Sequence, residues 1–431
     1  MPKKITNPIR WVRLDNAAKI YPAARRRNWS NVFRQSVTLK ENVDTEVLGS
    51  ALEVVVKRFP SIAARLRKGV FWYYLEQVKS APSIKEEYSY PLAYMSNEEM
   101  RRCAFRVIAY RDRIAVEFFH SLTDGTGALI FLKNLAAEYL EQKHGITIPL
   151  EHGIVDRSIA PPEEELEDCF LKNAAAVPLS RKDTDAWRMS GEPQPNGFLN
   201  LTCFKISTKE ALQKAHEHGT TLTVFMSAVM MKALYDLQDS KNPNRKRQKR
   251  IKLLIPVNLR RLFPSKTLRN FAMYVTPELD PRLGDYSFEE ICKIITHKLG
   301  AEFTAKHMGR IIATNVNDEK NPVVRLVPLP IKNMVMKAIF DTVGEKKSCL
   351  TLSNIGAVKL PDVMAEYVER FDFILGVQAA APYNCGMLSF EDTIYINFIR
   401  NVKDAELERH FFAVLRDLGL SAEVESNRNE R

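Results

Sequence analysis

The sequence predicts an α/β or α+β protein organised in two halves. Strands and amphipathic helices alternate in the first 150 residues, and a similar alternation resumes near residue 199. Between them, the stretch 151–199 is rich in proline, acidic and turn residues, as in "APPEEELED" and "SGEPQPNG". The 431 residues suffice for two domains of roughly 200 residues each. We therefore expect an N-terminal domain at 1–160, a crossover linker at 161–198 and a C-terminal domain at 199–431.

The elements of the first half follow from their hydrophobic patterns. Apolar residues at helical spacing predict a helix over 44–59, with Asp44 or Thr45 as its cap, and Pro60 ends it. The aromatic run at 69–78 predicts a strand. Two alternating segments, "AFRVIAY" and "IAVEFF", predict a hairpin, and a helix follows Gly125.

The second half is predicted to hold several strands and three helices. The first expected helix begins after residue 207 and ends at Gly219. The second spans about 222–237, and the third about 404–418. Its expected strands are 199–207, 251–257, 348–356, 371–380 and 393–400. The last ten residues are polar, and we expect them to be frayed.

A histidine and an aspartate lie at the predicted junction of a strand and a helix. The segment reads "AVEFFHSLTDGTGALIF", which places His120 and Asp124 on the connecting turn. One interpretation is an ordinary helix cap, since Asp, Thr and Gly are common there. The other is a general base, because a neutral imidazole at the rim of a sheet can take a proton from a hydroxyl group. The helix that starts at Gly125 could add free backbone N–H groups that stabilise a developing oxyanion.

Composition narrows the classes of protein. No apolar run approaches the roughly 18 residues of a membrane helix, and no apolar core follows the basic N-terminus, so we expect a cytoplasmic protein without a signal peptide. The six cysteines form no CxxC pair, which favours reduced thiols. His216 and His218 point about 200° apart on a helix and cannot share a metal ion. No metal site and no nucleotide-binding glycine loop is predicted.

The net charge of +11 includes a basic run, "KNPNRKRQKRIK", at 241–252. Nucleic-acid binding is one interpretation, but aromatic residues are not interleaved with the cations. A solvated loop tip is favoured, because the run follows a turn signal and leads into an apolar strand. Attraction of an anionic cofactor such as coenzyme A is a third interpretation.

The HxxxD string resembles the motif of the chloramphenicol acetyltransferase-like superfamily. This group includes coenzyme A-dependent alcohol acyltransferases and the condensation domains of nonribosomal peptide synthetases. Further segments resemble the bacterial alcohol acetyltransferase-like branch and occur in the same order along nearly the whole chain. They are "LDNAAKIYPA" (14–23), "RFPSIAARLRKGVFWYYLE" (58–76), "TLTVFMSAVMMKAL" (221–234), "LIPVNLRRLFPSKTLRNFAMYVTPEL" (254–279) and "LTLSNIGAVKLP" (350–361).

This resemblance implies two similar α/β domains with a tunnel between them. His120 would act inside the tunnel as general base for an acceptor hydroxyl or amine, which attacks the thioester directly without an acyl-enzyme. Asp124 would point away from substrate and pair with an arginine, for which Arg260 is the matching position and Arg261 the alternative. Such a pair would fix the geometry of the loop.

For three other positions the resemblance implies only that they line the tunnel. These are Asn270 and the pair Ser353 and Asn354. Phe119 stands where many condensation domains have a first histidine, which disfavours an assembly-line role. The plant DFGWG motif is absent, so plant substrates are not transferred.

The sequence therefore predicts an acyltransferase that moves an acyl group, in the first place acetyl, from a coenzyme A thioester to an alcohol. Coenzyme A is expected as co-substrate, with no permanently bound cofactor. The nearest alternative forms amides and takes its acyl group from a carrier protein acting in trans. A non-catalytic acyl-CoA binder is another alternative. We expect a monomer with no nucleic-acid partner.

Overall fold

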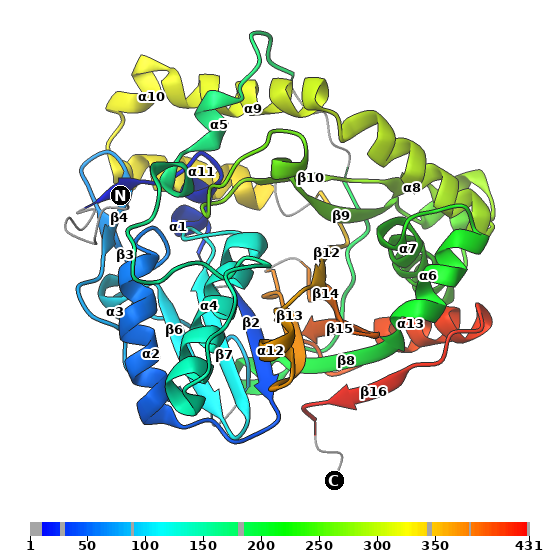
Figure 1. Cartoon of the computed structure of the whole chain (residues 1–431). Helices are drawn as coiled ribbons and strands as arrows, with labels where there is room; N and C mark the ends of the chain where they lie inside the picture. The colour runs from blue at the N-terminus through cyan, green and yellow to red at the C-terminus, as the bar shows by residue number, and fades with distance from the viewer. Residues whose placement is uncertain are drawn as a thin grey trace.

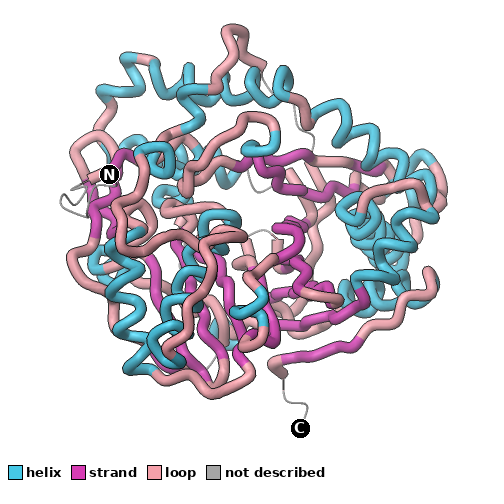
Figure 2. Tube along the Cα trace, viewed as in Figure 1, coloured by secondary structure: helices cyan, strands magenta, loops and turns pink. Residues whose placement is uncertain are grey.

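The protein has the mixed α/β architecture that the sequence predicts. The computed structural model describes residues 11–25, 31–87, 90–179, 185–342, 347–378 and 381–428. Figure 1 shows the N-terminal elements, coloured blue to cyan, on one side and the green helices of the C-terminal half on the other. In Figure 2 the helices lie mainly around the outside of the strands.

The N-terminal sheet contains five strands in the order β13–β2–β7–β6–β5. They are β13 (Val368–Ile374), β2 (Val32–Leu39), β7 (Arg113–Phe119), β6 (Phe105–Tyr110) and β5 (Lys85–Glu86). The hairpin of β6 and β7 is the predicted one. β13 comes from the predicted C-terminal domain, yet it pairs antiparallel with β2 along its whole length. One strand thus crosses the division expected from the sequence.

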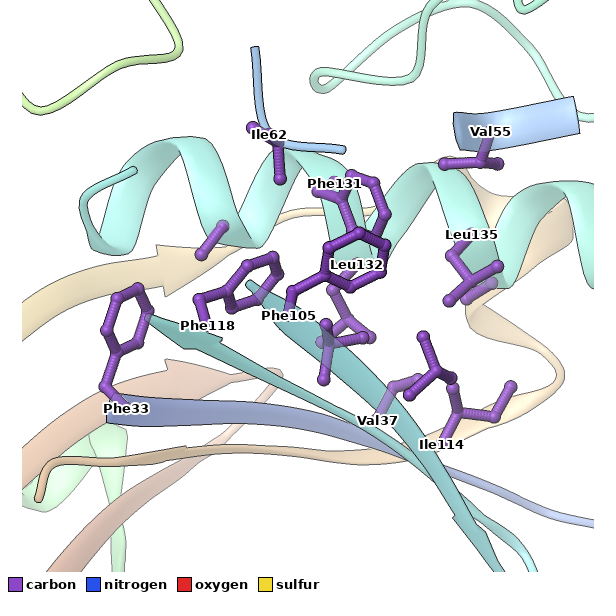
Figure 3. Packing of buried hydrophobic residues seen from close by; sticks show 14 of the residues in the cluster. Phe33, Val37, Val55, Ile62, Phe105, Ile114, Phe118, Phe131, Leu132 and Leu135 are labelled. Carbon is purple, nitrogen blue, oxygen red and sulfur yellow. The ribbon is translucent and has the colours of Figure 1, made fainter. Parts of the chain in front are cut away.

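Helices α2 (Thr45–Arg58) and α4 (Gly125–His144) pack on each other and cover this sheet. Both begin at an aspartate, Asp44 or Asp124, whose side chain accepts hydrogen bonds from the first free N–H groups of the helix. Figure 3 shows the core between them. Rings from Phe105 and Phe118 on the sheet meet Phe131 of α4 at centroid distances of 5.4 and 5.7 Å. These edge-to-face contacts fix α4, and with it the turn that carries His120.

The C-terminal sheet contains eight strands. Its main path is β10 (Ala272–Val275), β9 (Ile251–Asn258), β12 (Leu350–Val358), β14 (Tyr383–Phe390), β15 (Thr393–Arg400), β8 (Asn200–Ser207) and β16 (Glu423–Ser426), with β11 (Glu278–Leu279) beside β9. β12 runs parallel to both of its neighbours, and the other pairs are antiparallel. The helices of this half include α6 (Thr208–Glu217), α7 (Leu222–Lys241), α8 (Phe288–Glu302) and α13 (Glu406–Asp417).

A third, small sheet lies near the N-terminus. It has the order β1–β4–β3, with β1 (Val12–Arg13), β4 (Tyr73–Gln77) and β3 (Ala64–Lys68). Two short turns, η1 (Ala17–Lys19) and α1 (Ile20–Ala24), follow β1, and α1 packs on α11. The remaining helices are α3 (Asn97–Arg102), α5 (Cys169–Lys172), α9 (Ala305–Lys320), α10 (Pro322–Leu326), α11 (Leu329–Thr342) and α12 (Asp362–Ala365), and 3₁₀ turns occur at Glu163–Leu166, Pro195–Gly197, Arg245–Arg247, Leu259–Arg261 and Pro281–Leu283.

The polar C-terminal segment is not frayed where the structure describes it. β16 pairs antiparallel with β8 as an edge strand. Its carboxylates explain the pairing: Lys205 on β8 forms ion pairs with Glu423 and Glu425. The prediction of a frayed end was wrong because cross-strand charge pairs, rather than apolar residues, hold this strand.

No helix in the described ranges has both the length and the apolar character needed to cross a bilayer. The six cysteines are buried and unpaired, which agrees with the predicted reduced thiols.

Candidate active site

His120 lies directly after β7, on the turn that leads into α4. Its backbone N–H donates to the Asn31 carbonyl at 2.8 Å. The ring of Tyr21 stacks on the imidazole at a centroid distance of 4.4 Å, and Phe33 meets it edge-on at 5.0 Å. The residue keeps intermediate exposure. The ring is thus held on two sides by aromatic neighbours.

Asn270 fixes which nitrogen of His120 carries the proton. The Asn270 Nδ2 donates to the His120 carbonyl at 3.0 Å and lies 3.5 Å from the Asp15 carboxylate. The carbonyl and the carboxylate are both hydrogen-bond acceptors, so the nitrogen of the amide must face them. Its Oδ1 therefore faces His120 Nδ1, at 3.2 Å, as an acceptor. This assignment places the proton of neutral His120 on Nδ1 and leaves a lone pair on Nε2.

The surroundings also favour the neutral ring. Burial lowers the pKa of His120 below its ordinary value of 6.5, and its own backbone carbonyl, Asp124 and Asn270 oppose this only partly. At neutral pH the imidazole is unprotonated, as a general base must be.

Asp124 and Arg260, which the resemblance pairs, lie together in the structure. The Arg260 Nη1 is 2.7 Å from Asp124 Oδ2, and both side chains are largely buried. The Phe271 N–H donates to the same oxygen at 2.8 Å. Arg260 also donates to the carbonyls of Thr267 and Arg269. The alternative partner, Arg261, is exposed.

Not all backbone N–H groups in the first turn of α4 are free. Asp124 Oδ1 accepts from the N–H groups of Thr126 and Gly127, at 3.1 Å each. These two N–H groups are therefore already used by the cap and are not free for an oxyanion. The Gly125 N–H is not among the groups that this carboxylate caps. The cap and the candidate donor thus coexist in one turn.

Both glycines of this turn are required by close neighbours. A Cβ on Gly127 would lie 2.3 Å from the Leu268 carbonyl, which no side-chain rearrangement relieves. A Cβ on Gly125 would lie 2.9 Å from Ile355. The loop before β10 and strand β12 therefore both approach the beginning of α4.

Ser353 and Asn354, expected as lining, lie on β12 just before Ile355. Asn354 Nδ2 donates to Thr223 Oγ1 at 3.1 Å, and its Oδ1 accepts from the Gly356 N–H, so this side chain anchors the strand. Ser353 is buried. A further link to α4 comes from Asn258, whose Nδ2 donates to Thr126 Oγ1 at 3.1 Å.

The sequence analysis missed Tyr21 and Phe33, whose rings contact His120, and Asp15, which lies against Asn270. Asp15 is 1% exposed, and burial raises its pKa to about 6 although Arg269 lies nearby. Asp15 and Tyr21 fall within the segment 14–23, which the sequence marked only as a resemblance. Its distance of about 100 residues from His120 along the chain gave no signal of contact.

The structure also bears on the candidate metal ligands and on the basic run at 241–252. In the part of the chain that the structure describes, no three His, Cys, Asp or Glu side chains are grouped as metal ligands. Several cations of the basic run are neutralised: Arg245 pairs with Asp285, and Lys252, 2% exposed, pairs with Glu278. These ion pairs favour the structural interpretation of the run over nucleic-acid binding.

The family model of alcohol acetyltransferase matches residues 171–277. That segment contains Arg260 and Asn270 but not His120. No curated protein sequence matches the chain.

Solved structures share the fold over nearly the whole chain. TRI3 trichothecene 15-O-acetyltransferase from Fusarium sporotrichioides is 13% identical, with a TM-score of 0.61, over 97% of this chain and 96% of that one. F. graminearum TRI101, solved with coenzyme A and T-2 mycotoxin, is 10% identical, with a TM-score of 0.62, over 96% and 99%. The first condensation domain of the calcium-dependent antibiotic synthetase is 13% identical, with a TM-score of 0.59, over 96% of both chains.

These findings confirm the resemblance stated from the sequence: the chain has the fold of these acyltransferases and condensation domains and matches the alcohol acetyltransferase family model. The family match also confirms the predicted class of enzyme, an acyl-CoA-dependent O-acyltransferase.

Proposed function

We propose that this alcohol acetyltransferase-like protein uses His120 as general base in direct transfer of an acyl group from a coenzyme A thioester to an alcohol. The observation that carries the proposal is the Asn270 contact, which leaves His120 Nε2 with a free lone pair. Two structures of the same fold, TRI101 and the starter condensation domain of rhizomide synthetase, were solved with coenzyme A or an acyl-CoA. They support coenzyme A as the donor's carrier.

In the proposed reaction, His120 Nε2 takes the proton of the acceptor hydroxyl as its oxygen attacks the thioester carbonyl. The C–S bond then breaks, the ester forms, and the coenzyme A thiolate receives the proton from the imidazolium. Asn270 and Tyr21 hold the ring in place throughout. No protein nucleophile is needed, and the cysteines agree with this, since burial raises the pKa of all six thiols.

Asp124 and Arg260 have a positioning role in this proposal. The carboxylate points to Arg260, Phe271 and the start of α4. It thereby ties the His120 turn to the loop that carries Asn270. The Gly125 N–H, at the positive end of α4, is the group that we assign to the developing oxyanion.

We propose an acetyl donor, a cytoplasmic monomer, and two substrates that meet at His120 in a tunnel between the halves. Ser353 and Asn354 on β12, together with Asn270, are the proposed tunnel lining. An acyl carrier protein acting in trans is the alternative source of the acyl group, and an amine the alternative acceptor.

The experiment is release of free thiol from acetyl-CoA in the presence of a panel of alcohols and amines. We expect release with at least one alcohol, and a loss of about 10²- to 10⁴-fold in His120→Ala. His297→Ala, which alters an exposed histidine, is the matched control. Unchanged turnover in His120→Ala would refute the base assignment. Saturable binding of acetyl-CoA, with no release of free thiol for any combination of donor and acceptor, would favour the non-catalytic binder.

A further inference from the structure

A cavity of about 630 Å³ opens between the small N-terminal sheet and helices α9 and α10. Half of its lining residues are aromatic: Trp11, Phe71, Trp72, Tyr73 and Tyr74. Trp11 is 58% exposed and Phe71 is 40% exposed, so their rings are open to a ligand. Binding sites for small molecules have this volume and this kind of lining.

The charges around the cavity are unequal. Arg13, Lys19 and Arg325 line it, against one carboxylate, that of Glu319. Glu319 is already engaged, because it forms an ion pair with Lys19 and accepts a hydrogen bond from Asn16. Among the described residues, neither Arg13 nor Arg325 has an ion-pair partner, and Arg325 donates only from Nε to the Glu319 carbonyl at 3.4 Å. This leaves two guanidinium groups at the cavity for an anion.

The wall of the cavity is held in place by specific contacts from α11. Lys332, 5% exposed, lies 3.8 Å from the centroid of the Trp72 ring on the α11 side. Its Nζ donates to the carbonyls of Phe71 and Arg325, at 3.1 Å each. A second tie is the hydrogen bond from Asn333 Nδ2 to the Tyr73 hydroxyl, at 2.9 Å. The aromatic turn and the arginine are thus held by the same buried cation.

The cavity and His120 lie on opposite sides of one short segment. Lys19 lines the cavity, and Tyr21, two residues later, stacks on His120. Helical positions two apart point about 200° away from each other, which agrees with this arrangement. A molecule in the cavity therefore does not occupy the reaction site, but it touches the segment that holds the catalytic ring.

We propose that this cavity binds an organic anion with a flat aromatic body, the ring between Trp11, Phe71 and Trp72 and the acidic group on Arg13 and Arg325. Two sources share this chemistry. One is the adenosine 3′-phosphate end of a coenzyme A molecule, and the other is a separate aromatic acid. This proposal can be tested separately from the proposed reaction, because binding to the cavity is measured without turnover.

The test is a titration of the full-length protein followed by isothermal calorimetry, with four probes. Adenosine 3′,5′-diphosphate and 2-naphthoate carry both ring and charge, whereas 2-naphthalenemethanol lacks the charge and inorganic phosphate lacks the ring. We expect one or both aromatic anions to bind, and the other two probes to bind at least about tenfold more weakly.

Variants locate the binding. Arg13→Gln combined with Arg325→Gln is expected to weaken the aromatic anion about tenfold or more. The matched control is Arg101→Gln combined with Arg247→Gln, which removes the same charge from two exposed arginines elsewhere. Circular dichroism and the unfolding midpoint check that both double variants remain folded.

The outcomes separate the sources. Binding of adenosine 3′,5′-diphosphate that coenzyme A displaces supports the nucleotide source, and binding of 2-naphthoate alone supports a separate aromatic acid. The proposal is overturned if neither aromatic anion binds, if phosphate or the neutral alcohol binds equally well, or if the arginine double variant binds like the control.

Discussion

Two buried carboxylates, Glu117 and Asp124, lie seven residues apart and serve different purposes. Glu117, fully buried on β7, accepts hydrogen bonds from Arg34 on β2 at 2.6 and 2.8 Å and from Arg106 on β6 at 2.6 Å. These arginines hold its pKa below the ordinary value despite the burial. All three residues belong to one sheet, and the cluster joins neighbouring strands.

Asp124 joins segments that are distant in sequence. Its Oδ1 caps α4, and its Oδ2 receives Arg260 and the Phe271 N–H from about 140 residues later. The same carboxylate–guanidinium chemistry thus stabilises a sheet in one place and sets the geometry of the His120 turn in the other. The comparison teaches that the position of the partners, not the type of pair, decides whether a buried ion pair bears on stability or on activity.

The largest expected effect is on the stability of the sheet. Glu117→Leu removes the fully buried carboxylate that Arg34 and Arg106 share and leaves them only the outer carboxylates of Glu87 and Glu99. We expect a loss of about 3–5 kcal/mol in the free energy of unfolding. Urea denaturation followed by circular dichroism measures it. Glu98→Leu, at an exposed ion pair on α3, is the control and should change little. A loss in Glu117→Leu no greater than in the control would contradict the account.

The next effect is on turnover. Asp124→Asn removes the charge facing Arg260 while keeping the size of the side chain, and misplacement of His120 should lower kcat about 10- to 100-fold. The measurement is kcat and KM per folded molecule, beside the unfolding midpoint. If the loss of activity merely followed the loss of folded protein, Asp124 would be no different from Glu117, and the comparison would fail.

A smaller effect is expected at Asn270. Asn270→Ala removes the acceptor for His120 Nδ1, and kcat should fall about tenfold. The hydrogen bond that His120 Nδ1 donates to Asn270 raises the pKa of His120 against the effect of burial, so its removal should move the acid limb of the kcat/KM profile to lower pH. A profile with the same acid limb as the wild type would show that Asn270 does not act on the ring.

Helix α4 also carries a buried cation that has no carboxylate partner among the described residues. Lys133 of α4, 5% exposed, donates to the carbonyls of His152 and Lys359, and burial lowers its pKa from 10.5 to about 8. Between pH 8 and 10.5 the unfolded chain therefore holds more of this proton than the folded chain, so this residue's contribution to stability rises with pH.

Lys133→Met tests that sign, because other titrating groups are common to both proteins. The free energy of unfolding of the wild type minus that of the variant should increase by about 1 kcal/mol per pH unit from pH 8 to 10. A difference that stays constant or falls over this range would show that the ammonium group is not penalised in the folded state.

The sequence predicted the local features of the molecule well and the distant ones poorly. The hairpin before His120, the capped helices α2 and α4 and the Asp124–Arg260 partners followed from spacing or from the resemblance. Strand β14 was not predicted, because it is buried on both sides and shows no alternation. Helices α8 to α11 were also not predicted, although Ser287 and Glu290 form a capping box at the start of α8.

Contacts between distant segments were also beyond prediction. The crossing of β13 into the N-terminal sheet, the ring of Tyr21 on His120 and the role of Asn270 depend on tertiary packing across about 100 to 300 residues. The occupied N–H groups of Thr126 and Gly127 show a related limit. A sequence can indicate a cap, but not how many donors the cap leaves free.

The most direct measurement of the central claim is the ¹⁵N NMR spectrum of His120 at neutral pH, assigned by comparison with His120→Ala. The account predicts a neutral ring with its proton on Nδ1, a lone pair on Nε2, and a pKa below 6.5. A proton on Nε2, or an imidazolium at pH 7, would contradict it.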